Sequence, residues 1–188
     1  MRTTLALLSA LLLLPASSTA RTVEGVHVPE THQVDGQTLK LNGSALREAT
    51  ILGIDVYVIS LYRLNKTRSS KAVLACDEPL HLAKRFMRDV DKSDMLPPWR
   101  KAVAERARRF GVEMKRSAKA MLRGIPDTLE GQTLAFTWRP GKGLEVSLDG
   151  RITARVDDPR PEFCKVVYAG YVGGLANEPA IAKALTGG

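Results

Sequence analysis

The sequence predicts an α+β fold in which amphipathic helices pack on one face of an antiparallel sheet. The first observation is the order of the patterns, with strands first, then helices, then three more strands, then two final helices. The second is the alternation of apolar residues, which is typical of half-buried strands, in residues 134–138, 144–148 and 152–156. The third is Asp149-Gly150, a strong signal for a two-residue hairpin between the last two of these strands.

The strands of the first half are predicted mainly from composition. They are expected over residues 22–28, 37–42, 51–64 and 80–88. A turn at Asp35-Gly36 separates the first two, and the third is rich in β-branched and aromatic side chains. Gly53 predicts a bend in this long strand, and a short helix is expected over residues 69–76.

The middle of the chain is predicted to be helical. Apolar residues recur there at spacings of three and four, which places them on one helix face: Met95, Trp99, Val103, Ala107 and Phe110. Because proline fits only the first turn of a helix, the regular helix is expected to begin near Pro98. A second helix over about 112–123 should end at Gly124, and two further helices are expected over about 161–171 and 178–185.

The first twenty residues have the form of a cleaved secretion signal. Arg2 gives a positive start, an apolar run follows from Leu5 to Leu14, and small residues stand at Ser18 and Ala20. The apolar run is too short for a membrane-spanning helix, which needs roughly 20 residues. We therefore expect cleavage after Ala20 and a periplasmic or secreted protein. Residues 21–188 would then form a single domain.

The chain has two cysteines, Cys76 and Cys164. An oxidising compartment permits a disulfide between them. The alternative is that both are small buried apolar side chains. The sequence leaves the two possibilities open.

Basic residues are concentrated in the predicted central helices. The chain carries a formal net charge of +8, and residues 91–123 contain ten Lys or Arg against four Asp or Glu. An exported protein seldom meets nucleic acid, so no nucleic-acid partner is expected. We expect this charge to form a solvated helix face, and contact with an anionic membrane surface is the alternative.

The sequence contains no motif for a metal or a cofactor. The three histidines, His27, His32 and His81, are not paired at metal-ligand spacings, and there is no Cys-x-x-Cys. A nucleophile elbow, a phosphate loop and a dinucleotide fingerprint are also absent. We therefore expect no metal site, no cofactor and no catalytic residue of these classes.

Five segments in order resemble the bacterial branch of the chalcone isomerase-like family. They are residues 41–47, 56–62, 86–90, 140–143 and 178–185. The resemblance covers nearly all of the chain after the leader. It implies an open-faced β-sandwich, in which a large antiparallel sheet carries helices on one face and a ligand cleft lies between the two layers.

The plant enzymes of this family cyclise chalcones by adding a phenolate across an enone. The chemistry needs a cation to hold the phenolate and hydroxyl donors to polarise the ketone. The resemblance places Arg47 at the family's arginine, Tyr57 at a threonine position, and Trp99 near the catalytic tyrosine. The two changed positions argue against this reaction, so a chalcone isomerase-type intramolecular lyase is the alternative function and no catalytic residue is expected.

Other family members resemble fatty-acid-binding proteins, in which a buried arginine and a tyrosine hold the carboxylate. This resemblance implies a site that binds a small apolar acid such as a fatty acid, formed by Arg47, Tyr57, Trp99 and Val103. Two alternatives stay open. Arg47 would pair with a nearby acid such as Glu48 or Asp55, or the protein would be a structural accessory at a membrane surface. The sequence predicts no oligomeric state.

Overall fold

The computed structural model describes residues 20–49 and 53–187. The predicted signal peptide lies outside the described residues except for Ala20, so its cleavage stays a prediction. Within the described ranges, no helix is both long enough and apolar enough to span a membrane.

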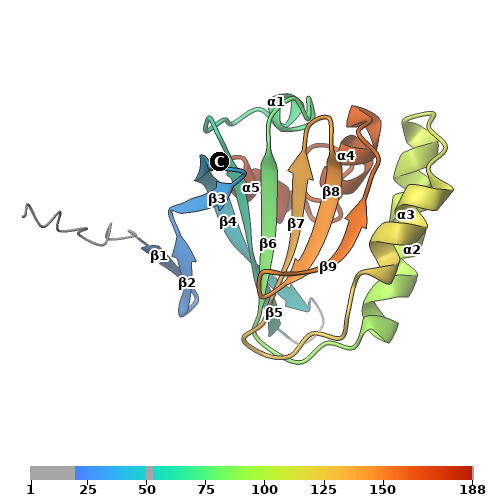
Figure 1. Ribbon diagram of the computed structural model, residues 1–188. Helices are drawn as coiled ribbons and strands as arrows, with labels where there is room; N and C mark the ends of the chain where they lie inside the picture. The colour runs from blue at the N-terminus through green and yellow to red at the C-terminus, as the bar shows by residue number, and fades with distance from the viewer. Residues whose placement is uncertain (1–19, 50–52, 188) are drawn as a thin grey trace, which may run out of the picture.

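A seven-stranded antiparallel sheet forms the centre of the molecule (Figure 1). Its strands pair in the order in which they occur along the chain: β3 (Thr31–Val34), β4 (Gln37–Ala49), β5 (Ile54–Arg63), β6 (Leu80–Phe86), β7 (Thr133–Arg139), β8 (Gly143–Leu148) and β9 (Arg151–Val156). A separate hairpin precedes the sheet and consists of β1 (Ala20–Val23) and β2 (Val26–Pro29). The predicted antiparallel α+β fold is therefore confirmed.

The helices are α1 (Ser70–Val73), α2 (Lys92–Arg109), α3 (Lys115–Arg123), α4 (Pro161–Tyr168) and α5 (Pro179–Leu185). Figure 1 shows α4 and α5 behind the sheet and α2 and α3 side by side next to β9. The main core lies between these helices and one face of the sheet. Fully buried Leu82, Phe136 and Trp138 from the strands meet Phe163 and Tyr168 from α4 in this core.

The opposite face of the sheet has a smaller apolar cluster at one end. Val28 of the hairpin packs there with Val34, Leu41, Val58 and Tyr62 of the first sheet strands. The alternation along β5 explains this arrangement, because successive side chains point to opposite faces. The hairpin therefore covers part of the face that the helices leave free.

The first strands differ from the prediction in their ends. Residues 22–28 were expected to form one strand, but Glu24 and Gly25 turn the chain with positive φ angles of 45° and 77°, which gives two short strands. The turn at Asp35-Gly36 is confirmed. The β5 strand begins after Gly53, and residues 51 and 52 of the predicted strand lie outside the described part of the chain.

The β4 strand continues to Ala49, well beyond the predicted end at residue 42. Its pairing with β5 shifts between Leu41 and Gly43, so a bulge lets the strand continue. Gly43 also lets α5 lie against the strand, because a Cβ there would come 2.1 Å from the Ala184 carbonyl oxygen. This extension matters because it carries Arg47.

The α2 helix begins at Lys92, so the expected start near Pro98 is wrong. Pro97 and Pro98 lie inside the helix, and neither has the N–H that would donate to the carbonyl group four residues earlier. The carbonyl groups left without this bond belong to Ser93 and Asp94, which are exposed and can accept hydrogen bonds from water instead. The second predicted helix begins later than expected, at Lys115.

Cys76 and Cys164 form a disulfide, with their Cα atoms 6.1 Å apart. The bridge joins the loop after α1 to α4 and links residues 88 positions apart. Both cysteines are buried, and the Trp138 indole donates a hydrogen bond of 3.0 Å to the Cys76 carbonyl. The disulfide is thus part of the main core.

The first prediction concerns this bridge. Replacing both Cys76 and Cys164 by alanine should lower the free energy of unfolding by about 4 kcal/mol, because a long closed loop in the unfolded chain is released. Urea denaturation monitored by tryptophan fluorescence measures the change. An unchanged midpoint would show that the bridge adds nothing to stability.

Candidate functional site

A lysine lies wholly inside the core on β6. Alternate residues Leu80, Leu82, Lys84 and Phe86 point toward the helices, and Lys84 has 0% of its surface exposed. Lys84 is not among the site residues predicted from the sequence. The sequence does contain a sign of it, because Lys84 is charged while the other residues on the same face of the strand, Leu80, Leu82 and Phe86, are apolar.

Four aromatic rings surround the Lys84 ammonium. Its Nζ atom lies 3.9 Å from the ring centre of Trp99, 4.6 Å from Tyr171, 4.9 Å from Tyr57 and 5.8 Å from Phe136. It also donates a hydrogen bond of 2.8 Å to the Tyr171 hydroxyl. The electron-rich ring faces attract a cation, so this aromatic cage stabilises the charged lysine.

No carboxylate of the described residues lies within ion-pairing distance of Lys84. Burial lowers its pKa well below the ordinary value of 10.5, and the nearby charges of Arg47 and Arg106 lower this pKa further. Glu178 acts in the opposite direction. A buried cation without a close negative partner is costly, so this position favours the binding of an anion.

Arg47 and Tyr57 lie at the outer edge of the cage. They are directly paired across β4 and β5. The Arg47 guanidinium forms an ion pair with Glu178, the residue that precedes α5, and donates to the backbone carbonyl of Glu48. The side chains of Arg47 and Glu178 are 28% and 32% exposed, so solvent reaches this pair.

The structure therefore gives Arg47 an acidic partner that the sequence did not suggest. Neither the Glu48 carboxylate nor Asp55 pairs with it in the described part of the chain. Burial raises the pKa of Tyr57 to about 12, with the charge of Arg47 acting against the increase. Tyr57 is thus a neutral hydrogen-bonding group next to two cations.

Arg106 on α2 is the third cation of the cluster. It is buried, and its Nε donates 2.8 Å to the Val166 carbonyl while its guanidinium also donates 3.2 Å to the Asn177 side chain. Gly170 makes room for it, because a Cβ at that position would lie 2.9 Å from the guanidinium carbon. Among the described residues, Glu178 is the one carboxylate that forms an ion pair with any of these three cations, so the site has a positive potential.

The space beside the cage is small. A cavity of about 20 Å³ lies against Trp99, Phe136 and Tyr171, and Val103 and Arg106 also line it. This volume is close to that of one water molecule. The aromatic side chains thus fill the cleft between sheet and helices, and a larger ligand requires Trp99 or Tyr171 to move.

The four predicted site residues gather around a residue that was not predicted. Arg47 and Tyr57 stand at the outer edge, Trp99 lies over the Lys84 ammonium, and Val103 lines the inner cavity. The structure brings them together from β4, β5 and α2.

The histidines lie away from this cluster. His32 and His81 stack with ring centres 3.7 Å apart. His81 and Lys84 are three positions apart on β6 and point to opposite faces of the sheet, so both rings lie on the face away from Lys84. Burial lowers the pKa of His81 to about 3, so its ring is neutral at physiological pH. In the described ranges, no group of three or more His, Cys, Asp or Glu side chains is placed to hold a metal ion.

The comparisons with known proteins agree with this architecture. The sequence profile of the family described as chalcone isomerase-like matches residues 20–185. A crystal structure of a fatty-acid-binding protein from Arabidopsis thaliana is similar in fold, with a TM-score of 0.73 and 16% sequence identity. The similarity covers 89% of this chain and 96% of the plant protein. No curated relative matches the chain by sequence.

The second prediction tests the state of Lys84 through pH. Between its lowered folded pKa and 10.5, the unfolded chain binds a proton that the folded chain has released, so raising the pH stabilises the fold. Relative to Lys84→Met, the wild-type protein should gain up to about 1.4 kcal/mol per pH unit. Urea denaturation at pH 8, 9 and 10 measures this difference.

The exposed Lys101→Met variant serves as the control and should follow the wild-type protein at each pH. A constant difference between wild type and Lys84→Met across this range would contradict the lowered pKa of Lys84.

Proposed function

Because the chain belongs to the chalcone isomerase-like family, we propose that it binds a small apolar acid such as a fatty acid. The ligand carboxylate would lie between Lys84 and Arg47, and the apolar tail would enter the cleft between the sheet and the helices. The observation that carries this proposal is the fully buried Lys84 ammonium with no carboxylate at ion-pairing distance among the described residues. The fold similarity to a fatty-acid-binding protein supports it.

A carboxylate supplies what the cage lacks. The Lys84 ammonium has three N–H donors, and only one bond to a described residue, the Tyr171 hydroxyl, satisfies them. A ligand carboxylate would accept a second bond, would neutralise the buried charge and would raise the pKa of Lys84 toward its ordinary value. The Tyr57 hydroxyl is close enough to Arg47 to take part at the outer edge.

Binding requires two local rearrangements. The ligand carboxylate competes with Glu178 for the Arg47 guanidinium, and this ion pair is partly exposed and therefore weak. The indole of Trp99 must move to make space. Trp99 directly follows Pro97 and Pro98, and this turn of α2 lacks two backbone hydrogen bonds, which makes its displacement easier.

The tail sets the affinity more than the head group does. Each buried methylene contributes about 0.8 kcal/mol, so ten of them contribute roughly 8 kcal/mol before the costs of binding. The charged contacts contribute less because desolvation offsets their attraction. The head group therefore selects acids, and the tail selects chain length.

We further propose that the protein works after export, in the periplasm or outside the cell. The leader motivates this location, and the buried Cys76–Cys164 disulfide is consistent with an oxidising compartment. Export also supports an anionic membrane surface as a partner. Seven exposed cations of α2 and α3 have no ion pair within the described residues: Arg100, Lys101, Arg108, Arg109, Arg116, Lys119 and Arg123.

A chalcone isomerase-type intramolecular lyase is the second candidate. The observation in its favour is the presence of cations beside the Tyr57 and Tyr171 hydroxyls, which are the groups that the phenolate and ketone require. Against it, the family resemblance places Tyr57 at a threonine position and Trp99 near the catalytic tyrosine, so two of the three polar groups of the reaction are changed. The binding role therefore has the better support.

The third prediction addresses this lyase activity. The protein should not accelerate the loss of chalcone absorbance above the uncatalysed rate, because Tyr57 and Trp99 replace two of the three polar groups that the family's reaction uses. Initial rates with and without protein measure this. A clear acceleration that disappears in Lys84→Met would favour the lyase instead.

The fourth prediction tests acid binding. Medium and long fatty acids should raise the melting temperature more than alcohols of the same length, because only ligand bound to the folded state stabilises it. The acid should bind more tightly by about 2 kcal/mol, or roughly thirtyfold, as expected for a hydrogen bond to a charged group. Thermal shift and titration calorimetry measure both ligands below their micelle thresholds.

Variants assign the head-group contacts. Lys84→Met and Arg47→Ala should each lose most of the preference for acid over alcohol and keep the dependence on chain length. Glu178→Gln should increase the affinity for acid, because it removes the carboxylate that competes for Arg47. Lys101→Met, outside the cleft, is the matched control. Equal binding of acid and alcohol by the wild-type protein would contradict the head-group assignment, and no binding of either would contradict the carrier function.

A further inference from the structure

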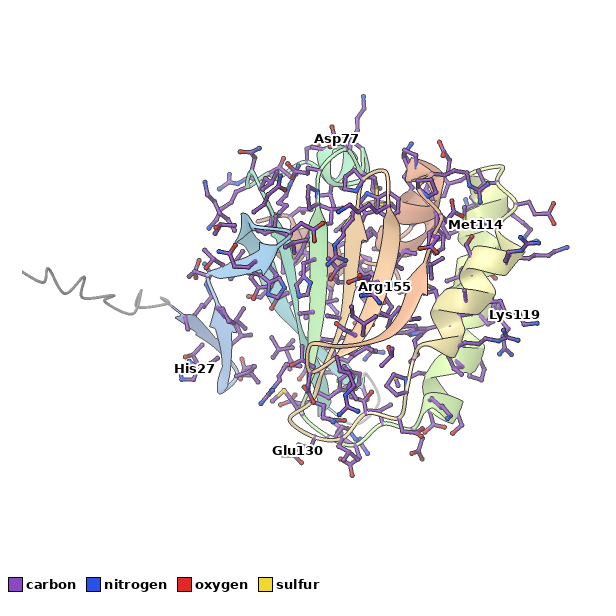
Figure 2. The ribbon with its side chains drawn as sticks, in the orientation of Figure 1. His27, Asp77, Met114, Lys119, Glu130 and Arg155 are labelled. Atoms are coloured by element: carbon purple, nitrogen blue, oxygen red, sulfur yellow. A yellow bond between two sulfur atoms is a disulfide. The ribbon has the colours of Figure 1, made fainter. Side chains whose placement is uncertain are left out.

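An open groove runs between α2 and α3, outside the cleft that contains Lys84. Its volume is about 760 Å³, within the range of small-molecule sites and far larger than the cavity beside Trp99. Figure 1 shows the two helices side by side next to β9, and Figure 2 shows Lys119 projecting outward from α3. The groove is therefore accessible from solvent.

The floor of the groove is apolar. Both helices and the segment between them contribute side chains of this kind: Leu96, Val103, Ala104, Ala107, Val112, Met114, Ala118 and Leu122. Three of these are alanines, whose short side chains leave space between the two helices. The lining residues of α2 run from Leu96 to Arg108, which gives the groove a length of about 18 Å.

The rim of the groove is basic. Five cationic side chains from both walls line it: Arg100, Arg108, Lys115, Lys119 and Arg123. The acidic rim residue is Glu113, which pairs with Lys115 at 3.4 Å. The other four cations form no ion pair with the described residues. An apolar floor between unpaired cations is complementary to an apolar chain with an anionic head.

We infer that this groove holds one acyl chain of an anionic phospholipid at a membrane surface. The phosphate of the lipid lies among Arg100, Lys119 and Arg123 on the rim, and the chain lies on the floor. This inference rests on the proposed contact with an anionic membrane and adds a specific site to it. Val103 lines both the groove and the cavity beside Trp99, so the two spaces are neighbours in the fold.

The test is co-sedimentation of the full exported chain with phosphatidylglycerol vesicles and, separately, phosphatidylcholine vesicles. The wild-type protein should bind the anionic vesicles more tightly, with an affinity that falls as salt rises. Reversing two rim charges in Arg100→Glu/Lys119→Glu changes the charge by four units and should weaken binding by on the order of 10³-fold, at ~1 kcal/mol for each unit of charge. Lys101→Glu/Arg109→Glu changes the net charge equally outside the groove and should weaken binding much less.

A second variant tests the acyl chain itself. Ala104→Trp fills the groove and keeps every charge, and Ala104 is exposed, so the fold should tolerate the change. Binding should fall roughly tenfold, although a surface tryptophan usually favours a membrane interface. Unchanged binding by Ala104→Trp, or equal losses in the two charge-reversal variants, would overturn the assignment of an acyl chain to the groove. The membrane contact would then be diffuse and electrostatic.

Two further outcomes separate this inference from the proposed function. Lys84→Met should bind vesicles as the wild-type protein does, and Ala104→Trp should keep its stabilisation by fatty acids. A wild-type protein that binds neither kind of vesicle would overturn both the membrane contact and the groove, and would leave acid binding in the cleft unaffected.

Discussion

The Lys84 side chain lies wholly inside the apolar layer between the sheet and the helices. Its ammonium can therefore contact only the groups that line this layer. Leu82 and Phe86, its neighbours on the same face of β6, give it no polar partner. The surrounding structure supplies the rings of Trp99 and Tyr57 and the hydroxyl of Tyr171. These contacts stabilise the cation, but they do not neutralise it.

The arrangement of the site follows from this unneutralised charge. Arg47 and Arg106 are near enough to lower the pKa of Lys84, and each is held by its own partner: Glu178 for Arg47 and the Val166 carbonyl for Arg106. Arg47, the cation at the outer edge of the cage, is therefore held in place without a ligand. In the proposed binding mode, an anion would meet a preorganised set of donors, and the main cost of binding would be the movement of aromatic side chains.

The sequence predicted the regular parts of the fold well and the irregular parts less well. Alternation in residues 134–156 predicted the last three strands because each has one buried face and tight turns. It could not predict the extension of β4 to Ala49, because this depends on the bulge between Leu41 and Gly43 and on the pairing with β5 beyond it. The predicted start of α2 was too late. The helix tolerates Pro97 and Pro98 because they lie on its solvent-exposed side, and the sequence alone does not show which side is exposed.

For the site, the resemblance to a family gathered Arg47, Tyr57 and Trp99 correctly into one region, but it did not supply their partners. The pairing of Arg47 with Glu178 joins residues at opposite ends of the chain, and no local pattern predicts such a contact. Lys84 was missed because a lysine in a strand usually extends its ammonium to solvent. The sequence also could not decide whether the disulfide forms, because its formation depends on the distance between Cys76 and Cys164 in the fold.

The strand order of the sheet has a consequence for how the chain reaches its native state. Every pairing from β3 to β9 joins strands that are consecutive in the sequence, so most pairings close only a short loop. Short loops cost little entropy, and folds with local pairings form quickly. The exception is the pair of β6 and β7, which α2 and α3 separate. We therefore expect the sheet to assemble as two meanders, whose joining closes the aromatic cage around Lys84 and is the slow step of folding.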